Sequence, residues 1–138
     1  FQPANAAVAN NANTNTGGMY GFGSTASFTP TRTGKIFVFY HASVQISSAV
    51  RAIKLDLRYG TGVAPANRDA LAGTLIDSVK EQIANSATIA ETITLLGFVT
   101  GLTLNTAYWF DLALDGGDGS TATASSNNND IYIVEAMN

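Results

Sequence analysis

The acidic and amide side chains near the end of the sequence are the groups best suited to binding a cation. Asp115 and Asp118 flank two glycines, and three asparagines at 127–129 lead directly into Asp130. Carboxylate and amide oxygens are the hard ligands that calcium prefers, but this spacing matches no EF-hand loop. Aspartate beside glycine is also ordinary chemistry for a hairpin turn. The pattern therefore favours turns and loops, with a calcium site at Asp115, Asp118 and Asp130 as the alternative.

Side chains for nucleophilic or acid–base catalysis are scarce. His41 is the only histidine and the chain has no cysteine. Ser24 lies in a glycine-rich stretch that only superficially resembles a nucleophile elbow. The clusters Gly60-Thr61-Gly62 and Gly116-Gly117 are not followed by the lysine and hydroxyl residue of a phosphate-binding loop. These glycines are predicted to form turns, and no cofactor is expected.

Asp56 and Asp111 are the candidates for a pair of carboxylates, the arrangement that hydrolyses glycosidic bonds when the two groups lie roughly 5 to 10 Å apart. Asp56, however, alternates with Lys54 and Arg58, which is the pattern of a solvated strand face. We therefore expect Asp56 to be exposed, and we assign no catalytic residue. The sequence predicts a protein that is not an enzyme.

The elements that must position these residues are short strands with a period of two. Residues 35–46 alternate strictly, which sends one apolar row inward and places Phe37, Phe39 and His41 on the opposite face. Residues 51–59 repeat the pattern, with Leu55 and Leu57 among the inward side chains. Further strands are predicted at 20–28, 89–100, 106–114 and 131–136.

Two segments are less regular. Residues 60–73 contain three glycines and a proline and are predicted to form a long loop. In residues 74–84, Leu75, Val79 and Ile83 recur every four positions, which fits an amphipathic helix, yet they also share one side of a strand, and a strand is favoured. About seven to eight short strands without alternating helices predict an all-β fold, a sandwich or a barrel, and we favour an antiparallel β-sandwich of one domain.

Outward aromatic side chains predict an association surface. On the strand at 106–114, Trp109 must lie on the face opposite Tyr108 and Phe110, because successive strand side chains alternate. If both faces of a sheet are apolar, one chain covers only one of them. We therefore predict a subunit interface, with cover within the chain and a glycan-stacking platform as the alternatives. The interface candidates are Phe37, Phe39, His41 and Trp109.

The composition limits the classes of partner. Only 12% of the 138 residues are charged, against about 25% in typical domains, which is expected of a surface covered by neighbouring copies. Seven scattered basic residues and a net charge of −3 argue against nucleic-acid binding. No run approaches the roughly 20 apolar residues that span a bilayer. The start at Phe1 lacks both a signal-peptide pattern and an initiator methionine, which suggests a processed chain or a piece of a longer one.

The first 18 residues differ from the rest. They are rich in alanine, asparagine and threonine, and they lack the large apolar side chains that would offset the entropy of ordering them. They are predicted to form an extended N-terminal arm, either loose or ordered by lying on a neighbouring subunit. Residues 19–138 then form the β-sandwich domain.

Three separated stretches resemble a family of small modules found in virion proteins of tailed phages and prophages. They are residues 27–35 (SFTPTRTGK), residues 57–62 (LRYGTG) with 64–67 (APAN), and residues 101–109 (GLTLNTAYW). The resemblance covers about residues 14–136. Members are jelly-roll modules similar in shape to tumour-necrosis-factor and C1q heads, which commonly form trimers. The segment 74–91 departs from the family pattern, because it is more charged and more helix-like.

The resemblance implies a jelly-roll protein on the surface of a phage particle. The expected function is a capsid decoration or cement protein, a homo-oligomer with a trimer favoured, bound to other virion proteins such as the major capsid protein. The alternative is the head domain of a tail fibre that binds bacterial surface glycan. No catalytic residue is carried over from the family.

Overall fold

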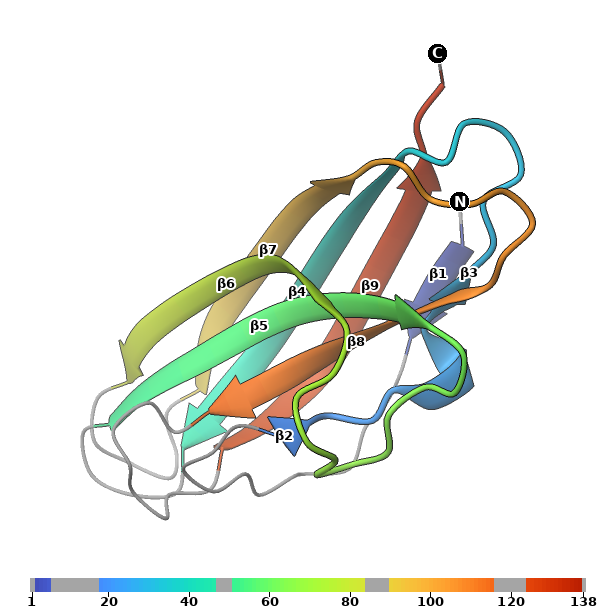
Figure 1. Cartoon of the computed structure of the whole chain (residues 1–138). Coiled ribbons are helices and arrows are strands. Elements are labelled where there is room, and N and C mark those ends of the chain that lie inside the picture. Colours follow the sequence, from blue (N-terminus) through green and yellow to red (C-terminus); the bar gives the residue numbers. More distant parts are fainter. Residues whose placement is uncertain (1, 6–17, 47–50, 84–89, 116–123, 138) are drawn as a thin grey trace.

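The computed structural model describes residues 2–5, 18–46, 51–83, 90–115 and 124–137, and these form two antiparallel sheets packed face to face (Figure 1). Sheet A has the strand order β1-β9-β4-β7, and sheet B has the order β2-β8-β5-β6, with β3 also paired to β8. The elements are β1 Gln2–Asn5, β2 Gly18–Met19, the 3₁₀ turn η1 Gly23–Thr25, β3 Ser27–Phe28, β4 Ile36–Ile46, β5 Arg51–Thr61, β6 Thr74–Ile83, β7 Ala90–Val99, β8 Tyr108–Asp115 and β9 Ala124–Glu135.

The predicted all-β antiparallel sandwich is confirmed by this arrangement. The first strand pairs with the last, β4 pairs with both β9 and β7, and β8 pairs with β5. This order is compatible with a jelly roll, and the finer assignment to that type stays a prediction. No helix within the described ranges is long and apolar enough to cross a membrane.

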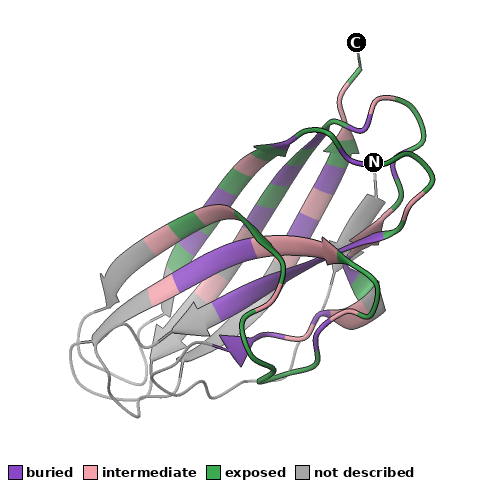
Figure 2. Ribbon diagram, in the orientation of Figure 1, coloured by how far each residue is buried: buried purple, intermediate pink, exposed green. Residues whose placement is uncertain are grey.

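The core lies between the sheets and is filled by alternate side chains of the long strands (Figure 2). A fully buried aliphatic or aromatic side chain contributes about 1.5–3 kcal/mol relative to an exposed one, so these rows hold the two sheets together. The inward residues of the strands are Ile36, Val38, Tyr40, Leu55, Leu57, Ile93, Leu95, Tyr108, Phe110, Leu112, Ile131 and Ile133.

The strand predicted at 20–28 is wrong. The structure has two short strands, β2 and β3, separated by η1. Gly21 and Gly23 adopt φ angles of +84° and +61°, in the left-handed region that glycine tolerates and extended strands avoid. At Gly21 a Cβ would also lie 2.5 Å from the backbone nitrogen of Asn67. The two glycines therefore turn the chain away from sheet B and back again.

The strand favoured at 74–84 is confirmed as β6, but its face was misread. Leu57 pairs with Asp77 and the next residue, Arg58, pairs with Leu75, so Ile76 is an extra residue in the ladder. Such a bulge reverses the alternation of side chains along the strand. Ile76 and Val79 consequently both pack against the core, while Leu75 is 47% exposed.

Strand β9 begins seven residues before the predicted start at 131. It pairs with β4 along almost its whole length, with one register shift between His41 and Ser43. The asparagine run that leads to Asp130, which was expected to be a turn or loop, is therefore strand.

The predicted arm at residues 1–18 is partly placed by the structure. Gln2–Asn5 form β1, antiparallel to β9 of the same chain, and Gly18 begins β2. Residues 6–17 lie outside the described residues.

Candidate functional site

The outer face of sheet A carries a compact group of apolar and aromatic side chains, of which all but the half-buried Tyr132 are exposed. Phe37 lies opposite Phe98 on one side and Val134 on the other, and Phe39 lies opposite Leu96 and Tyr132. The ring centroids of Phe37 and Phe98 are 4.6 Å apart, and those of Phe39 and Tyr132 are 6.1 Å apart. We call these residues the aromatic face: Phe37, Phe39, Leu96, Phe98, Tyr132 and Val134.

The sequence forces this exposure, because the same strands send their alternate residues into the core. The exposed fractions of Phe37, Leu96 and Phe98 are 48%, 60% and 52%. Taken together, the side chains of the aromatic face leave on the order of 500 Å² of apolar surface in water, which is the size of the largest, often functional, patch on a typical monomer. The predictions that Phe37 and Phe39 are exposed on an outward face are confirmed.

His41 lies next to this face, toward the C-terminal end of β4. It follows Phe39 on the same side of β4, it is half-buried, and its Nδ1 lies 3.3 Å from Oγ1 of Thr94. Asp130 is its register partner on β9. His41 therefore marks the point where the apolar surface gives way to polar side chains, as the rim of an interface does.

The outer face of sheet B around β2 and β8, in contrast, is covered by the chain itself. The loop of residues 62–73, green in Figure 1, crosses β8 beside β2. Two backbone hydrogen bonds fasten it there: Arg68 donates to Met19 over 2.9 Å, and Met19 donates to Asp69 over 2.9 Å. We call this segment the covering loop.

Trp109 lies beneath the covering loop and is only 6% exposed. Its Nε1 donates to the carbonyl of Thr61 over 3.2 Å, and it packs with Met19 and Ala113. A Cβ added at Gly60 or Gly73 would collide with the indole ring, so both glycines are needed for the close fit. This corrects the expectation that Trp109 lies at a subunit interface, because its face is covered within the chain.

Asp56 fastens the other end of the covering loop. The Nη1 of Arg58 donates to the Asp56 carboxylate over 3.1 Å, and Ser78 donates to it over 2.7 Å. Arg58 also donates from Nε to the carbonyl of Ala72 and from Nη2 to that of Gly73. The expectation that Asp56 is exposed is wrong, since it is 5% exposed and holds the arginine that binds the loop.

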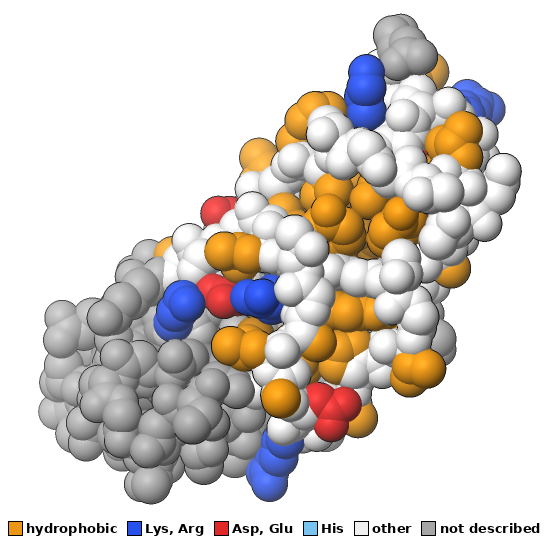
Figure 3. All heavy atoms as spheres, viewed as in Figure 1, with side chains coloured by type: hydrophobic (Ala, Val, Ile, Leu, Met, Phe, Trp, Pro, Cys, Tyr) orange, Lys and Arg blue, Asp and Glu red, His pale blue; other side chains and the backbone are white. Residues whose placement is uncertain are grey.

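A second cation completes this charged group. The Nζ of Lys54 lies 3.4 Å from Asp56 on the side away from the loop. Figure 3 accordingly shows an acidic side chain between two basic ones on this face of the molecule. The alternating charges of β5 are therefore an ion-pair group beside the covering loop.

Asp111 is the most deeply buried carboxylate described, at 1% exposed. It accepts hydrogen bonds from the backbone nitrogens of Gly21 (3.1 and 2.9 Å), Phe22 (3.3 Å) and Leu112 (2.8 Å). Burial raises the pKa of Asp111 to about 6, against the opposing effect of these donors. The side chain thus holds the segment after β2 on sheet B.

The two carboxylates weighed as a catalytic pair lie on the same outer face. Asp56 pairs with Ala113 and Arg58 pairs with Asp111, which makes Asp56 and Asp111 diagonal neighbours across β5 and β8. Each binds groups of its own chain, and neither lines the open pockets described below. Their contacts account for both residues as anchors of the cover over sheet B.

Two of the three calcium candidates lie in different sheets. Asp115 ends β8 in sheet B, opposite Lys54, whereas Asp130 lies in β9 of sheet A. Asp118 lies outside the described residues. Among the residues that the structure describes, no group of three or more histidine, cysteine or acidic side chains could hold a metal ion.

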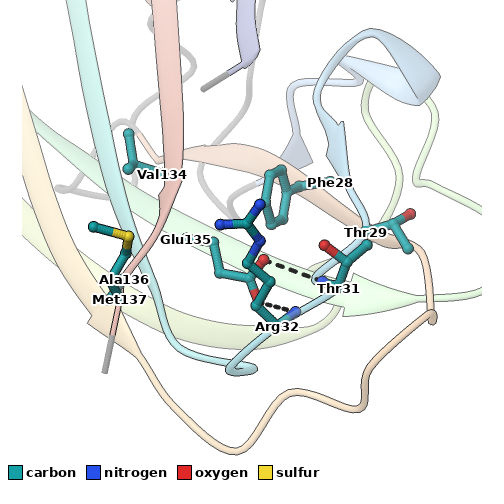
Figure 4. A pocket seen from close by; sticks show the side chains of 8 residues that line it. All are labelled: Phe28, Thr29, Thr31, Arg32, Val134, Glu135, Ala136 and Met137. Atoms are coloured by element: carbon teal, nitrogen blue, oxygen red, sulfur yellow. Dashed lines mark hydrogen bonds between the residues drawn. The ribbon is translucent and has the colours of Figure 1, made fainter.

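A feature that sequence reasoning missed lies at the end of β9. Glu135 accepts backbone hydrogen bonds from Thr31, Arg32, Thr33 and Gly34 over 2.7–3.2 Å, two of them dashed in Figure 4. These donors, that of Thr33 foremost, lower the pKa of Glu135 to about 2. The glycine and threonines of this turn were visible in the sequence, but their acceptor lies about a hundred residues away.

Two open pockets flank these features. One, of about 530 Å³, lies beside Glu135 and is lined partly by Phe28, Arg32 and Val134 (Figure 4). The other, of about 440 Å³, lies at the edge of Trp109 beside Val63, which is 95% exposed.

Comparison with known proteins identifies no family for this chain. No protein-family model matches the sequence, and no curated protein matches it either. Among solved structures, an arabinose-bound MgGH51 α-L-arabinofuranosidase is similar over 78% of this chain, with 18% identity and a TM-score of 0.41. The chain spans 19% of the length of that enzyme. This likeness is too low to support an argument about activity.

Proposed function

We propose that this chain is a non-enzymatic structural protein on the surface of a bacteriophage particle, a capsid decoration or cement protein of jelly-roll type. It works as a homo-oligomer, with a trimer favoured, bound to neighbouring virion proteins such as the major capsid protein. The observation that supports this role is that the chain covers the two outer faces of the sandwich to different extents. The chain covers the part of sheet B around Trp109 and leaves the aromatic face of sheet A largely in water.

The covered face explains how a single chain keeps a defined surface on the side of sheet B. Polar anchors at Asp56, Asp111 and Asn67 hold the cover over Trp109, and Asn67 donates to the carbonyl of Tyr20 over 2.8 Å. Burying Asp56 and Asp111 without partners would be costly, so the segments that supply their partners are a fixed part of the fold. The side left for association is sheet A, where apolar contact supplies the energy and rim polar groups supply the fit.

Locating the protein on an intact particle tests the proposal. Labelled antibody and electron microscopy of the particles should place it on the capsid faces in a regular lattice. Capsid shells prepared without the protein should recover resistance to heat or chelator when the purified oligomer is added. Label at the tail tip, or shells that gain nothing from the oligomer, would contradict a cement role.

The pocket at the edge of Trp109 favours a second candidate, the glycan-binding head of a tail fibre. An indole edge in an open pocket of about 440 Å³, beside an exposed loop tip at Val63, suits a sugar ring. A glycan array with the purified oligomer separates the two functions. Selective binding that is lost in a Val63→Glu variant would support the fibre, and an array without selective signal would support the decoration protein.

A further inference from the structure

We propose that β1 is exchanged between copies, so that Gln2–Asn5 of one chain pair with β9 of a neighbouring chain in the assembled protein. This inference rests on the proposed function as an oligomer. It names the segment that ties the copies together and the edge that receives it.

The first support is the way in which β1 is attached. β1 is a four-residue edge strand, and its register partners all lie on β9, from Gln2 opposite Ile133 to Asn5 opposite Asp130. Pro3 within it has no N–H to donate, and proline is tolerated in strands at such edges. The pairing is therefore made by backbone groups along one side of β9, and β9 of any copy offers the same groups.

The second support is the connection to the rest of the chain. Twelve residues, 6–17, separate β1 in sheet A from β2 in sheet B. Twelve residues can reach at most about 40 Å when extended, whereas packed sheets are only about 10 Å apart. Apart from Val8, this connection has no apolar side chain larger than alanine. Its length and composition therefore do not fix which copy receives β1, and exchange of an identical element is a low-cost route to oligomers.

The third support is position, because the β1 edge adjoins the aromatic face. Pro3 pairs with Tyr132, which belongs to that face, and Val134 follows two residues later on β9. A neighbouring copy whose β1 pairs with this β9 therefore has its N-terminal segment beside the aromatic face. Interface and exchanged strand thus form one continuous contact.

The opposite edge of sheet A is closed by the chain itself. The backbone nitrogen of Leu96 on β7 donates to the Asp77 carboxylate over 3.1 Å, and Ile76 lies where a side chain at position 97 would be. Strand addition is thereby hindered at β7, so the place in sheet A that can accept a strand of another chain is β9, once its own β1 has left it.

Cysteine pairing tests the exchange, and the chain has no cysteine of its own to interfere. Asn5→Cys copies and Asp130→Cys copies, carrying different tags, are mixed in denaturant, refolded together and oxidised. Directly opposed strand residues have Cβ atoms about 4.5–5.5 Å apart, so a short bismaleimide is used in parallel with oxidation. Exchange predicts a covalent heterodimer of the two tagged copies that disappears on reduction in the oxidised sample.

Two controls make each outcome decisive. Met137→Cys copies, 83% exposed at that site, replace the Asp130→Cys copies to measure random collision and should give at least tenfold less heterodimer. The double variant Asn5→Cys/Asp130→Cys reports pairing within a chain. If it closes inside single chains while the mixture yields no heterodimer above the Met137→Cys background, exchange is refuted. A mixture and a double variant that both fail to crosslink also refute it.

Sedimentation of the unmodified chain separates the strand-exchange proposal from the proposed function on which it rests. An oligomer without heterodimer crosslinks would leave the building-block function intact and eliminate strand exchange alone. A chain that sediments as a monomer at high concentration would contradict the proposed function itself.

Discussion

The aromatic face makes the sharpest prediction, tested by the double substitution Phe37→Gln/Phe98→Gln. Both side chains are about half exposed, so each leaves roughly 100 Å² of ring surface for a partner. At about 25 cal/mol per Å², each ring contributes on the order of 2.5 kcal/mol to every interface, or nearly a hundredfold in the dissociation constant. The two rings touch, so their contributions are not additive. We expect the double variant to weaken assembly at least a hundredfold.

Sedimentation velocity over a concentration series measures the change, with thermal unfolding of the monomer alongside. The ring pair also stabilises one chain, by about 0.5–1.5 kcal/mol, so a small loss of monomer stability is expected. Leu71→Gln is the matched control, because Leu71 is 49% exposed but lies on the covering loop, and it should assemble as the parent does. An unchanged assembly midpoint in a folded Phe37→Gln/Phe98→Gln variant would refute the assignment of this face.

Three further predictions concern the cover and its anchors. Gly60→Ala drives a Cβ into Trp109 and should cost about 1–3 kcal/mol in chemical denaturation while leaving assembly unchanged; full stability would mean that the loop does not hold the indole. Asp111 titrates near pH 6 when folded and near 3.8 when unfolded, so the unfolding free energy should fall by about 3 kcal/mol as pH rises through this window, and Asp111→Asn should remove that fall. The pH dependence of stability that Glu135 causes has the opposite sign. Its contribution to the unfolding free energy is complete above pH 4.5 and disappears towards pH 2. Glu135→Gln should therefore lose this acid dependence in the same denaturation series.

Period-two alternation was enough to predict the sandwich and its core. Leu55, Leu57, Phe110 and Leu112 are buried as their spacing required, because an inward row has to meet the other sheet. The same alternation placed Phe37 and Phe39 outward. These predictions succeed because they depend only on local geometry, which each strand carries in its own sequence.

The errors arose where distant segments act on a strand. Asp56 and Trp109 are outward by alternation, as expected, but the loop of residues 62–73 folds over them, and no local pattern reports where a loop will lie. The bulge at Ile76 puts Leu75 and Val79 on opposite faces of β6. Their four-residue spacing in the sequence therefore does not mark one side of the strand. The asparagine run before Asp130 has a low strand propensity, and it is strand because β4 offers backbone partners along its length.

The different treatment of the two outer faces links the fold to its proposed role. A chain that only needed to be stable could cover both faces, and this one uses a twelve-residue loop, buried carboxylates and close-fitting glycines to cover one. The strands of the other face place three phenylalanines side by side and leave about half of their surface in water, where that half adds nothing to the stability of a single copy. The exposed part of those rings stabilises the protein only when another surface excludes water from it. The structure of one chain is therefore most economically explained as one part of an assembly.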